Sequence, residues 1–117
     1  MAIDHFHART ERDGEDTVMR LDGELDMSGT FVLEPKLDEL AAESLDGDVL
    51  FDLRGITFID STGLAALIGA HERLNQAGVP TRFVRGSDDV QRVLAVAGFD
   101  EVLEFVDPPP DDVHPVT

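Results

Sequence analysis

Apolar residues along the chain follow strand-like and helix-like spacings in turn. Residues 3–9 and 17–21 form two short extended segments. The polar stretch between them, from Thr10 to Asp16, centres on Asp13-Gly14, which is typical of a turn. The two segments are therefore predicted to pair as an antiparallel hairpin.

A first helix is predicted after the segment Asp22 to Asp26. Its apolar stripe consists of three leucines at helical spacing, Leu33, Leu37 and Leu40. Pro35 lies inside this pattern and removes a backbone donor. The helix is therefore expected either to begin near Pro35 or to be distorted in its first turns.

The second half of the chain continues the alternation. A buried strand is predicted over residues 49–53, then a loop around Gly55 and a helix over residues 62–77. The apolar face of that helix consists of Leu64, Leu67, Ile68, His71 and Leu74. Residues 81–85 predict another strand, Ser87 caps a third helix that Gly98 closes, and residues 102–106 form a short strand or extended segment.

Strands that alternate with helices imply right-handed crossovers and a mainly parallel sheet. The predicted fold class is a single α/β domain, in which the N-terminal hairpin adds one antiparallel strand and helices follow the strands. The domain is predicted over residues 1–106. Residues 107–117 are rich in Pro and Asp and have no periodicity, so we expect a flexible tail there.

The net negative charge of the chain disfavours two classes of partner, nucleic acids and anionic membranes. Twenty-five acidic residues against nine basic ones give a formal net charge of −16, which repels nucleic-acid phosphates and anionic membranes. Direct binding of nucleic acid or membrane is therefore not expected. The chain has no cysteine, and its first residues have neither the basic nor the apolar part of a secretion signal, so we expect a cytoplasmic protein.

The segment from Phe58 to Leu64 carries the candidate chemistry, because it joins the predicted buried strand to the second helix. Ser61 or its neighbour is expected to cap this helix, close to unpaired N–H groups and the positive end of the helix dipole. A phosphoryl group on Ser61 would add about −1.5 to −2 of charge there, next to Asp60. Gly63, which has no side chain, is expected to let a partner approach closely. The simpler interpretation is that Ser61 only caps the helix.

An enzyme is not indicated. Ile59 occupies the position where a nucleophile elbow needs glycine. His71 lies ten residues beyond Ser61 on the same helix, about 15 Å away at 1.5 Å per residue, too far to act as its base. No zinc, calcium or phosphate-loop motif is present in the sequence. We therefore predict no catalytic residue, no cofactor and no metal site.

Several motifs together resemble the STAS domain family. They are Gly23-Glu24-Leu25-Asp26, Asp52-Leu53, Ile59-Asp60-Ser61-Thr62-Gly63-Leu64, Val90-Gln91-Arg92-Val93-Leu94 and Ala97-Gly98-Phe99. Their order and spacing are similar to the family from about Thr17 to Val106. Pro35 departs from the pattern of the first helix.

Within that family, free-standing domains of this length with an Asp-Ser-Ser or Asp-Ser-Thr loop look like anti-sigma factor antagonists. The resemblance implies that an anti-sigma factor with serine kinase activity phosphorylates Ser61, and that phosphorylation abolishes binding. It implies that the unphosphorylated form binds that kinase and releases a sigma factor, and that a phosphoserine phosphatase restores binding. The implied partner-binding residues are Asp22, Gly23, Glu24, Asp26, Asp60, Thr62 and Gly63. The alternative is an unswitched STAS scaffold or a subunit of a transport assembly, which acts only by protein–protein contact.

Overall fold

The computed structural model describes residues 5–43 and 45–108, and within them it has five strands and three helices. In chain order these are β1 (Phe6–Asp13), β2 (Asp16–Leu25), α1 (Met27–Ala42), β3 (Val49–Ile59), α2 (Ser61–Gln76), β4 (Thr81–Val84), α3 (Asp88–Val96) and β5 (Phe105–Val106). Of the predicted tail, Asp107 and Pro108 are described, and the remainder lies outside the described residues, as does the start of the predicted first strand.

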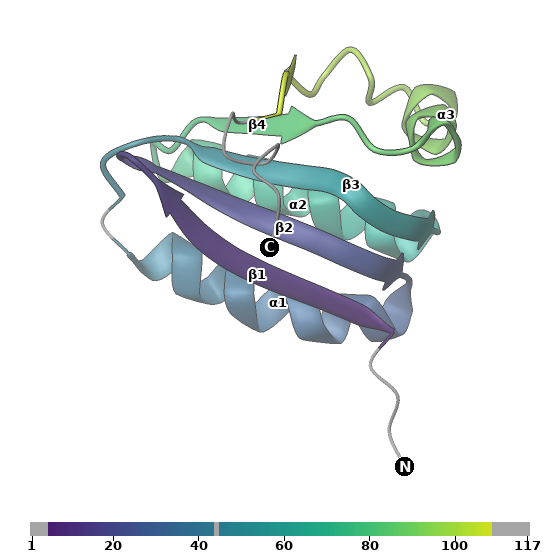
Figure 1. Ribbon diagram of the computed structural model, residues 1–117, viewed down its shortest axis with the longest axis horizontal. Coiled ribbons are helices and arrows are strands. Elements are labelled where there is room, and N and C mark those ends of the chain that lie inside the picture. Colours follow the sequence, from purple (N-terminus) through teal and green to yellow (C-terminus); the bar gives the residue numbers. More distant parts are fainter. Residues whose placement is uncertain (1–4, 44, 109–117) are drawn as a thin grey trace, which may run out of the picture.

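The strands form one sheet in the order β1-β2-β3-β4-β5 (Figure 1). β1 and β2 are antiparallel, and every later pair is parallel. From β2 onward, each connection leads to the neighbouring strand in the same direction across the sheet. Because such connections are right-handed, successive helices lie on the same face of the sheet. Figure 1 shows α1 and α2 beneath that face. The predicted fold class is confirmed.

The hairpin is longer than predicted and its turn is shorter. Asp13 pairs with Asp16, so the loop consists of Gly14 and Glu15 alone. Gly14 has a φ of 64°, which a two-residue hairpin loop requires and glycine adopts without strain. The polar residues from Thr10 to Asp13 belong to the strand because β1 lies at the exposed edge of the sheet.

Helix α1 begins at Met27 and continues through Pro35, so it does not begin near the proline. Pro35 is exposed. The carbonyl of Phe31, which loses its intrahelical donor, therefore lies near solvent. Leu33, Leu37 and Leu40 are buried, as the stripe predicted.

The predicted loop around Gly55 is wrong, because β3 continues through it to Ile59. The register with β2 shifts near this point, between Arg20 and Asp22. A Cβ on Gly55 would overlap a carboxylate oxygen of Asp22 and lie 2.8 Å from the carbonyl oxygen of Leu21. Glycine is therefore needed for close packing within a strand, and does not mark a turn.

The core lies between the sheet and the helices. Phe51 of β3 stacks on Phe83 of β4, with ring centroids 5.2 Å apart. Residues from all three helices join this cluster, including Leu33, Leu67 and Leu94. The predicted cap of α3 is confirmed, since the Ser87 hydroxyl accepts from the Val90 N–H. Within the described residues, no helix is long and apolar enough to cross a membrane.

Candidate functional site

Ser61 is the first residue of α2, and its side chain is exposed. The residue that caps the helix is Asp60, whose Oδ1 accepts a hydrogen bond from the Gly63 N–H at 2.9 Å. The Asp60 carbonyl accepts from the Leu64 N–H at 2.9 Å. The sequence analysis did not decide whether Ser61 or its neighbour caps the helix. In the structure the cap is Asp60. Within the described residues, the Ser61 hydroxyl has no hydrogen-bond partner.

The start of α1 repeats this arrangement. Asp26 caps α1, and its Oδ1 accepts from the Gly29 N–H at 2.9 Å. Leu25 and Ile59, the last residues of β2 and β3, are register partners in the parallel sheet. The two caps therefore lie side by side at the carboxyl ends of β2 and β3. Both helix N-termini point toward the surface at this end of the strands (Figure 1).

Gly63 is buried against β2 and is not open to a partner. A Cβ at this position would overlap the carbonyl oxygen of Leu25 and lie 2.8 Å from Leu25 Cγ. The expectation that Gly63 allows a partner's close approach does not fit this geometry. What approaches Gly63 is the chain's own backbone, at the point where α2 packs on the end of β2.

The segment from Asp22 to Asp26 lies next to Ser61 but presents few of its side chains to solvent. Glu24 is exposed and pairs in register with Phe58. Asp22 is half-buried beside Gly55, and Asp26 is half-buried in its capping role. Gly23 has a φ of 101° and packs on the backbone of His5. Glu24 is therefore the member of this segment best placed to touch another protein.

Three large apolar side chains near Ser61 are exposed, and the sequence analysis missed them. Met27 is 60% exposed, Phe31 72% and Phe58 51%. Helical spacing identified the buried stripe of α1 through its leucines, but apolar residues off that stripe give no sequence signal of their own. Exposed Met and Phe are typical of protein-binding surfaces.

An ion-pair cluster fixes which side of α1 carries Met27 and Phe31. Arg73 of α2 contacts Asp38 at 2.7 Å and Glu34 at 3.6 Å, so these two acids lie on the side of α1 that faces α2. Phe31 precedes Glu34 by three residues and Met27 precedes Phe31 by four, so both share that side. They lie at the same end of the helix pair as Ser61.

The histidine on α2 belongs to a separate structural cluster. His71 Nδ1 lies 2.6 Å from the Thr81 hydroxyl on β4, and Asn75 contacts both groups. The hydrogen bond joins α2 to the sheet and has no contact with Ser61. Across residues 5–43 and 45–108, no group of three or more His, Asp or Glu side chains is arranged to hold a metal ion.

Comparison with known proteins identifies the family to which this fold belongs. The STAS domain model matches residues 7–112, which is most of the chain. The chain belongs to the STAS domain family. The anti-sigma F factor antagonist of Paenibacillus polymyxa is 26% identical over 77% of this chain and 77% of that protein. The anti-sigma-B factor antagonist of Bacillus subtilis is 23% identical over 86% of this chain and 91% of that protein.

A solved structure gives the same result. The anti-sigma factor antagonist from Mycobacterium paratuberculosis superposes with a TM-score of 0.80 at 25% identity, covering 95% of this chain and 92% of that one. The resemblance to the STAS family stated from the motifs is confirmed.

Proposed function

We propose that this STAS protein is an anti-sigma factor antagonist whose binding is switched by phosphorylation of Ser61. In its unphosphorylated form it binds an anti-sigma factor that is also a serine kinase, and so releases a sigma factor. The kinase phosphorylates Ser61 and ends the complex, and a phosphoserine phosphatase restores it. The relatives named above, all anti-sigma factor antagonists, support this assignment.

The observation that carries the proposal is that Asp60 caps α2 and that Ser61, the next residue, does not. Asp60 caps α2, so the exposed Ser61 hydroxyl is not needed to hold the helix. A kinase can therefore modify Ser61 without removing a hydrogen bond of the fold. Thr62 is half-buried in the first turn, so Ser61 is the more accessible of the two hydroxyl groups.

The same geometry explains how a phosphate would end binding and leave the fold intact. The first N–H groups of a helix have no intrahelical acceptor, so a phosphoryl group at Ser61 would lie near donors and the positive helix end. A partner that packs on Met27 and Phe31 would meet this new charge at the edge of an apolar contact. An unpaired charge buried at an interface costs several kcal/mol.

The test measures phosphorylation and binding together. Intact-mass analysis of the protein from its native cell, before and after phosphatase treatment, should show a phosphate that peptide mapping places on Ser61. Ser61→Ala should bind the anti-sigma factor constitutively, and Ser61→Asp should weaken binding at least tenfold, about 1.4 kcal/mol. Ala95→Asp adds the same charge on the exposed part of α3 and should bind like the wild type.

Three results would contradict the proposal. A phosphate mapped to Thr62 or Ser87 would remove Ser61 from the switch. Unchanged binding by Ser61→Asp, together with no phosphate in the native cell, would favour the unswitched STAS module. Tighter binding by Ser61→Asp would mean that the partner recognises the phosphorylated form.

A further inference from the structure

Strand β1 forms one edge of the sheet and, among the described strands, pairs only with β2. It has eight residues without proline or glycine, and its register with β2 runs without a bulge from Phe6 to Asp13. Proteins usually protect such an edge with a proline, a bulge or charged side chains, because its unpaired backbone groups can bond to another strand. Of these three devices, β1 has only the charges.

The backbone groups of every second residue of β1 point away from β2. The Glu24 N–H donates to the His5 carbonyl at 2.8 Å, so these two residues form a hydrogen-bonded pair next to the register pair of Phe6 and Gly23. Hydrogen-bonded pairs alternate along an antiparallel ladder, so the odd-numbered residues of β1 bond to β2. The even-numbered residues therefore present their N–H and C=O groups at the free edge, where Thr10 is central.

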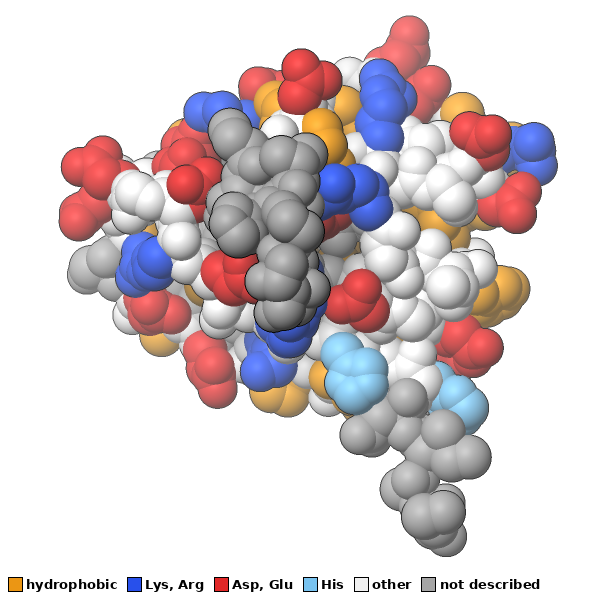
Figure 2. Space-filling view, in the orientation of Figure 1, with side chains coloured by type: hydrophobic (Ala, Val, Ile, Leu, Met, Phe, Trp, Pro, Cys, Tyr) orange, Lys and Arg blue, Asp and Glu red, His pale blue; other side chains and the backbone are white. Residues whose placement is uncertain are grey.

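The side chains of the odd-numbered residues lie on the sheet face opposite the helices, which we call the open face. Phe6 and Ala8 belong to the core beneath the helices, and side chains alternate along a strand. The residues of β1 on the open face are therefore His7, Arg9, Glu11 and Asp13, and all four are exposed. Figure 2 shows basic and acidic side chains interspersed along the β1 side of the molecule.

Arg9 differs from the arginines next to it on the open face. Its register partner Arg20 donates to Asp52 at 2.9 Å and to Glu11 at 3.1 Å, and Arg54 donates to both Asp52 oxygens, at 3.0 and 2.7 Å. Burial alone would raise the pKa of Asp52, but the Arg54 hydrogen bonds and the charges of both arginines outweigh it and hold the pKa below its ordinary value. Arg9 has no hydrogen bond or ion pair with any residue that the structure describes. It lies beside a like charge, so a carboxylate from another molecule would stabilise it.

The free backbone groups allow β1 to pair with β1 of a second copy around Thr10. In an antiparallel pair centred there, Thr10 bonds to Thr10 of the second copy, and Ala8 bonds to Arg12 of the second copy. Each of these residues has its N–H and C=O at the free edge, so every backbone bond of the new ladder has a donor and an acceptor.

The charges of β1 are complementary to themselves in this register. Arg9 faces Glu11 of the second copy, and by symmetry Glu11 faces Arg9 of the second copy. Further out, His7 faces Asp13 of the second copy, and an imidazole N–H can donate to a carboxylate. Opposite charges directly across an antiparallel pair contribute about 0.2–1 kcal/mol each.

Neighbouring registers are not complementary. Only shifts by two residues keep the free backbone groups opposite one another. A shift in one direction places Arg9 opposite Arg9 of the second copy, and a shift in the other places Glu11 opposite Glu11. Like charges at directly opposite positions are destabilising. The charges of β1 therefore disfavour other pairings of this edge and favour one self-pairing.

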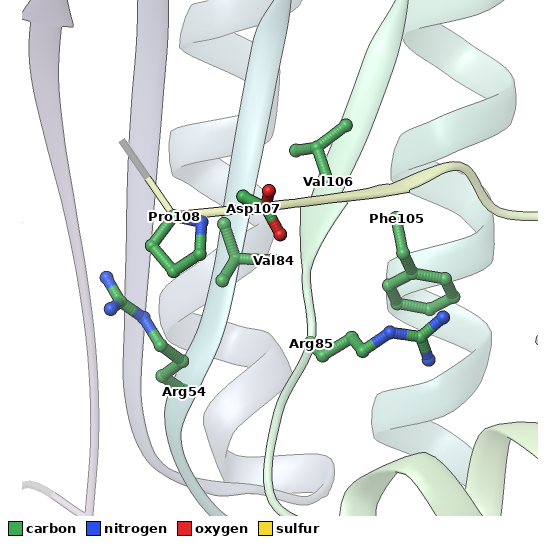
Figure 3. Close-up of a pocket in the computed structure, with 7 residues that line it drawn as sticks. All are labelled: Arg54, Val84, Arg85, Phe105, Val106, Asp107 and Pro108. Atoms are coloured by element: carbon green, nitrogen blue, oxygen red, sulfur yellow. The ribbon is translucent and has the colours of Figure 1, made fainter. Parts of the chain in front are cut away.

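The other edge of the sheet is a poor partner for β1. β5 has only two residues, and the chain after it turns across the open face, where Asp107 and Pro108 lie with Val84 of β4 and Arg54 of β3 around a cavity of about 610 Å³ (Figure 3). A head-to-tail contact between β1 and β5 would join few backbone groups. A contact of β1 with itself has two-fold symmetry and closes with two copies.

We propose that this protein forms a two-fold symmetric dimer in which β1 pairs antiparallel with β1 of a second copy, centred on Thr10. The dimer has one continuous sheet with five strands from each copy. Because the two copies run in opposite directions, their Ser61 residues lie at opposite ends of the joined sheet and stay accessible. The proposal does not depend on the Ser61 switch. A single pair of edge strands is a small contact, so we expect a dissociation constant of about 10 μM to 1 mM.

The test measures self-association of the full chain by sedimentation equilibrium up to about 1 mM, the weak end of this range. Arg9→Glu and Glu11→Arg each place like charges opposite one another in both symmetric pairs, and each should weaken association at least tenfold, about 1.4 kcal/mol. An equimolar mixture of the two variants should associate more tightly than either alone, because each facing pair is then of opposite charge. The double variant Arg9→Glu with Glu11→Arg should restore self-association for the same reason.

Two matched controls carry the same charge changes away from β1. Arg92→Glu on α3 and Glu101→Arg after it alter exposed side chains and should associate like the wild type. Thr10→Pro removes a backbone N–H at the free edge, where proline is tolerated, so it should keep a cooperative melting transition and lose the dimer. A wild type that stays monomeric at about 1 mM would overturn the proposal. So would association that the β1 variants leave unchanged, or a mixture that associates no better than its components.

Discussion

Replacement of Gly63 by alanine should separate the role of this residue in the fold from a role in binding. The new Cβ would overlap the Leu25 carbonyl oxygen and lie 2.8 Å from Leu25 Cγ. The side chain of Leu25 can rotate, but its backbone carbonyl is held in the sheet beside Ile59. Relief therefore requires the first turn of α2 to move away from β2, which also strains the hydrogen bond from the Gly63 N–H to Asp60.

Overpacking of this kind typically costs 1–3 kcal/mol. Because the clash is with backbone, we expect a loss of about 2 kcal/mol or more in the free energy of unfolding. For a domain of this size, each kcal/mol changes the melting temperature by roughly 3–6 °C. Gly63→Ala should therefore melt about 6–12 °C below the wild type.

Gly69→Ala is the matched control in the same helix. A Cβ at Gly69 meets nothing within 4 Å. Alanine is favoured over glycine inside a helix by about 0.5–1 kcal/mol, so this variant should melt above the wild type. Thermal melting and urea unfolding of the three proteins provide the comparison. If Gly63→Ala were as stable as the wild type and lost only partner binding, Gly63 would be a binding residue and the packing explanation would be refuted.

Three further predictions concern the cap, the buried carboxylate and the apolar surface. Asp60→Ala should cost about 0.5–2 kcal/mol in unfolding free energy through the lost cap, while Ser61→Ala should be near neutral; equal losses in urea titrations would mean that both side chains cap α2. Asp52→Asn should lower the free energy of unfolding by about 1.5–3 kcal/mol at pH 7. Arg20 and Arg54, which both donate to the Asp52 carboxylate, lose a charged acceptor in this variant. Since the folded pKa of Asp52 lies below the unfolded value of about 3.9, its contribution is present above that pH and is lost as pH falls through the folded pKa. The difference in unfolding free energy between the wild type and Asp52→Asn should therefore decrease between pH 7 and pH 3. A difference that stays constant over this range would contradict the explanation. Phe31→Ser should weaken binding of the anti-sigma factor without lowering the melting temperature, whereas a large drop in melting temperature would place Phe31 in the core.

The sequence predicted the fold well because its apolar spacings are regular where elements are buried. Leu33, Leu37 and Leu40 identified the face of α1, and the Ser87 cap set the start of α3. The errors occur where a residue suited to a turn has a different use. Gly55 was interpreted as part of a loop, but it lies inside β3 because Asp22 packs on it. A contact between residues 33 positions apart has no local signal.

The candidate site was only partly accessible to sequence reasoning. Ser61 was identified through the Asp-Ser-Thr-Gly pattern and its resemblance to a family. Asp and Ser are equally good capping residues, so their order alone could not assign the cap. Met27 and Phe31 were missed because their exposure depends on how α1 packs against α2, which helical spacing does not determine.

The two helix starts show how a phosphate could change binding and leave the fold intact. Both have an aspartate cap and a glycine three residues later that packs closely on the chain before it, on Leu25 for Gly63 and on the Glu24 carbonyl for Gly29. These residues hold the helices on the sheet. The residues directly after the caps, Met27 in α1 and Ser61 in α2, are exposed. They are therefore free to serve binding, one as an apolar contact and the other as a hydroxyl that can gain charge. A phosphate at Ser61 would alter the surface that a partner contacts, while the Asp60 and Gly63 contacts that support α2 stay in place.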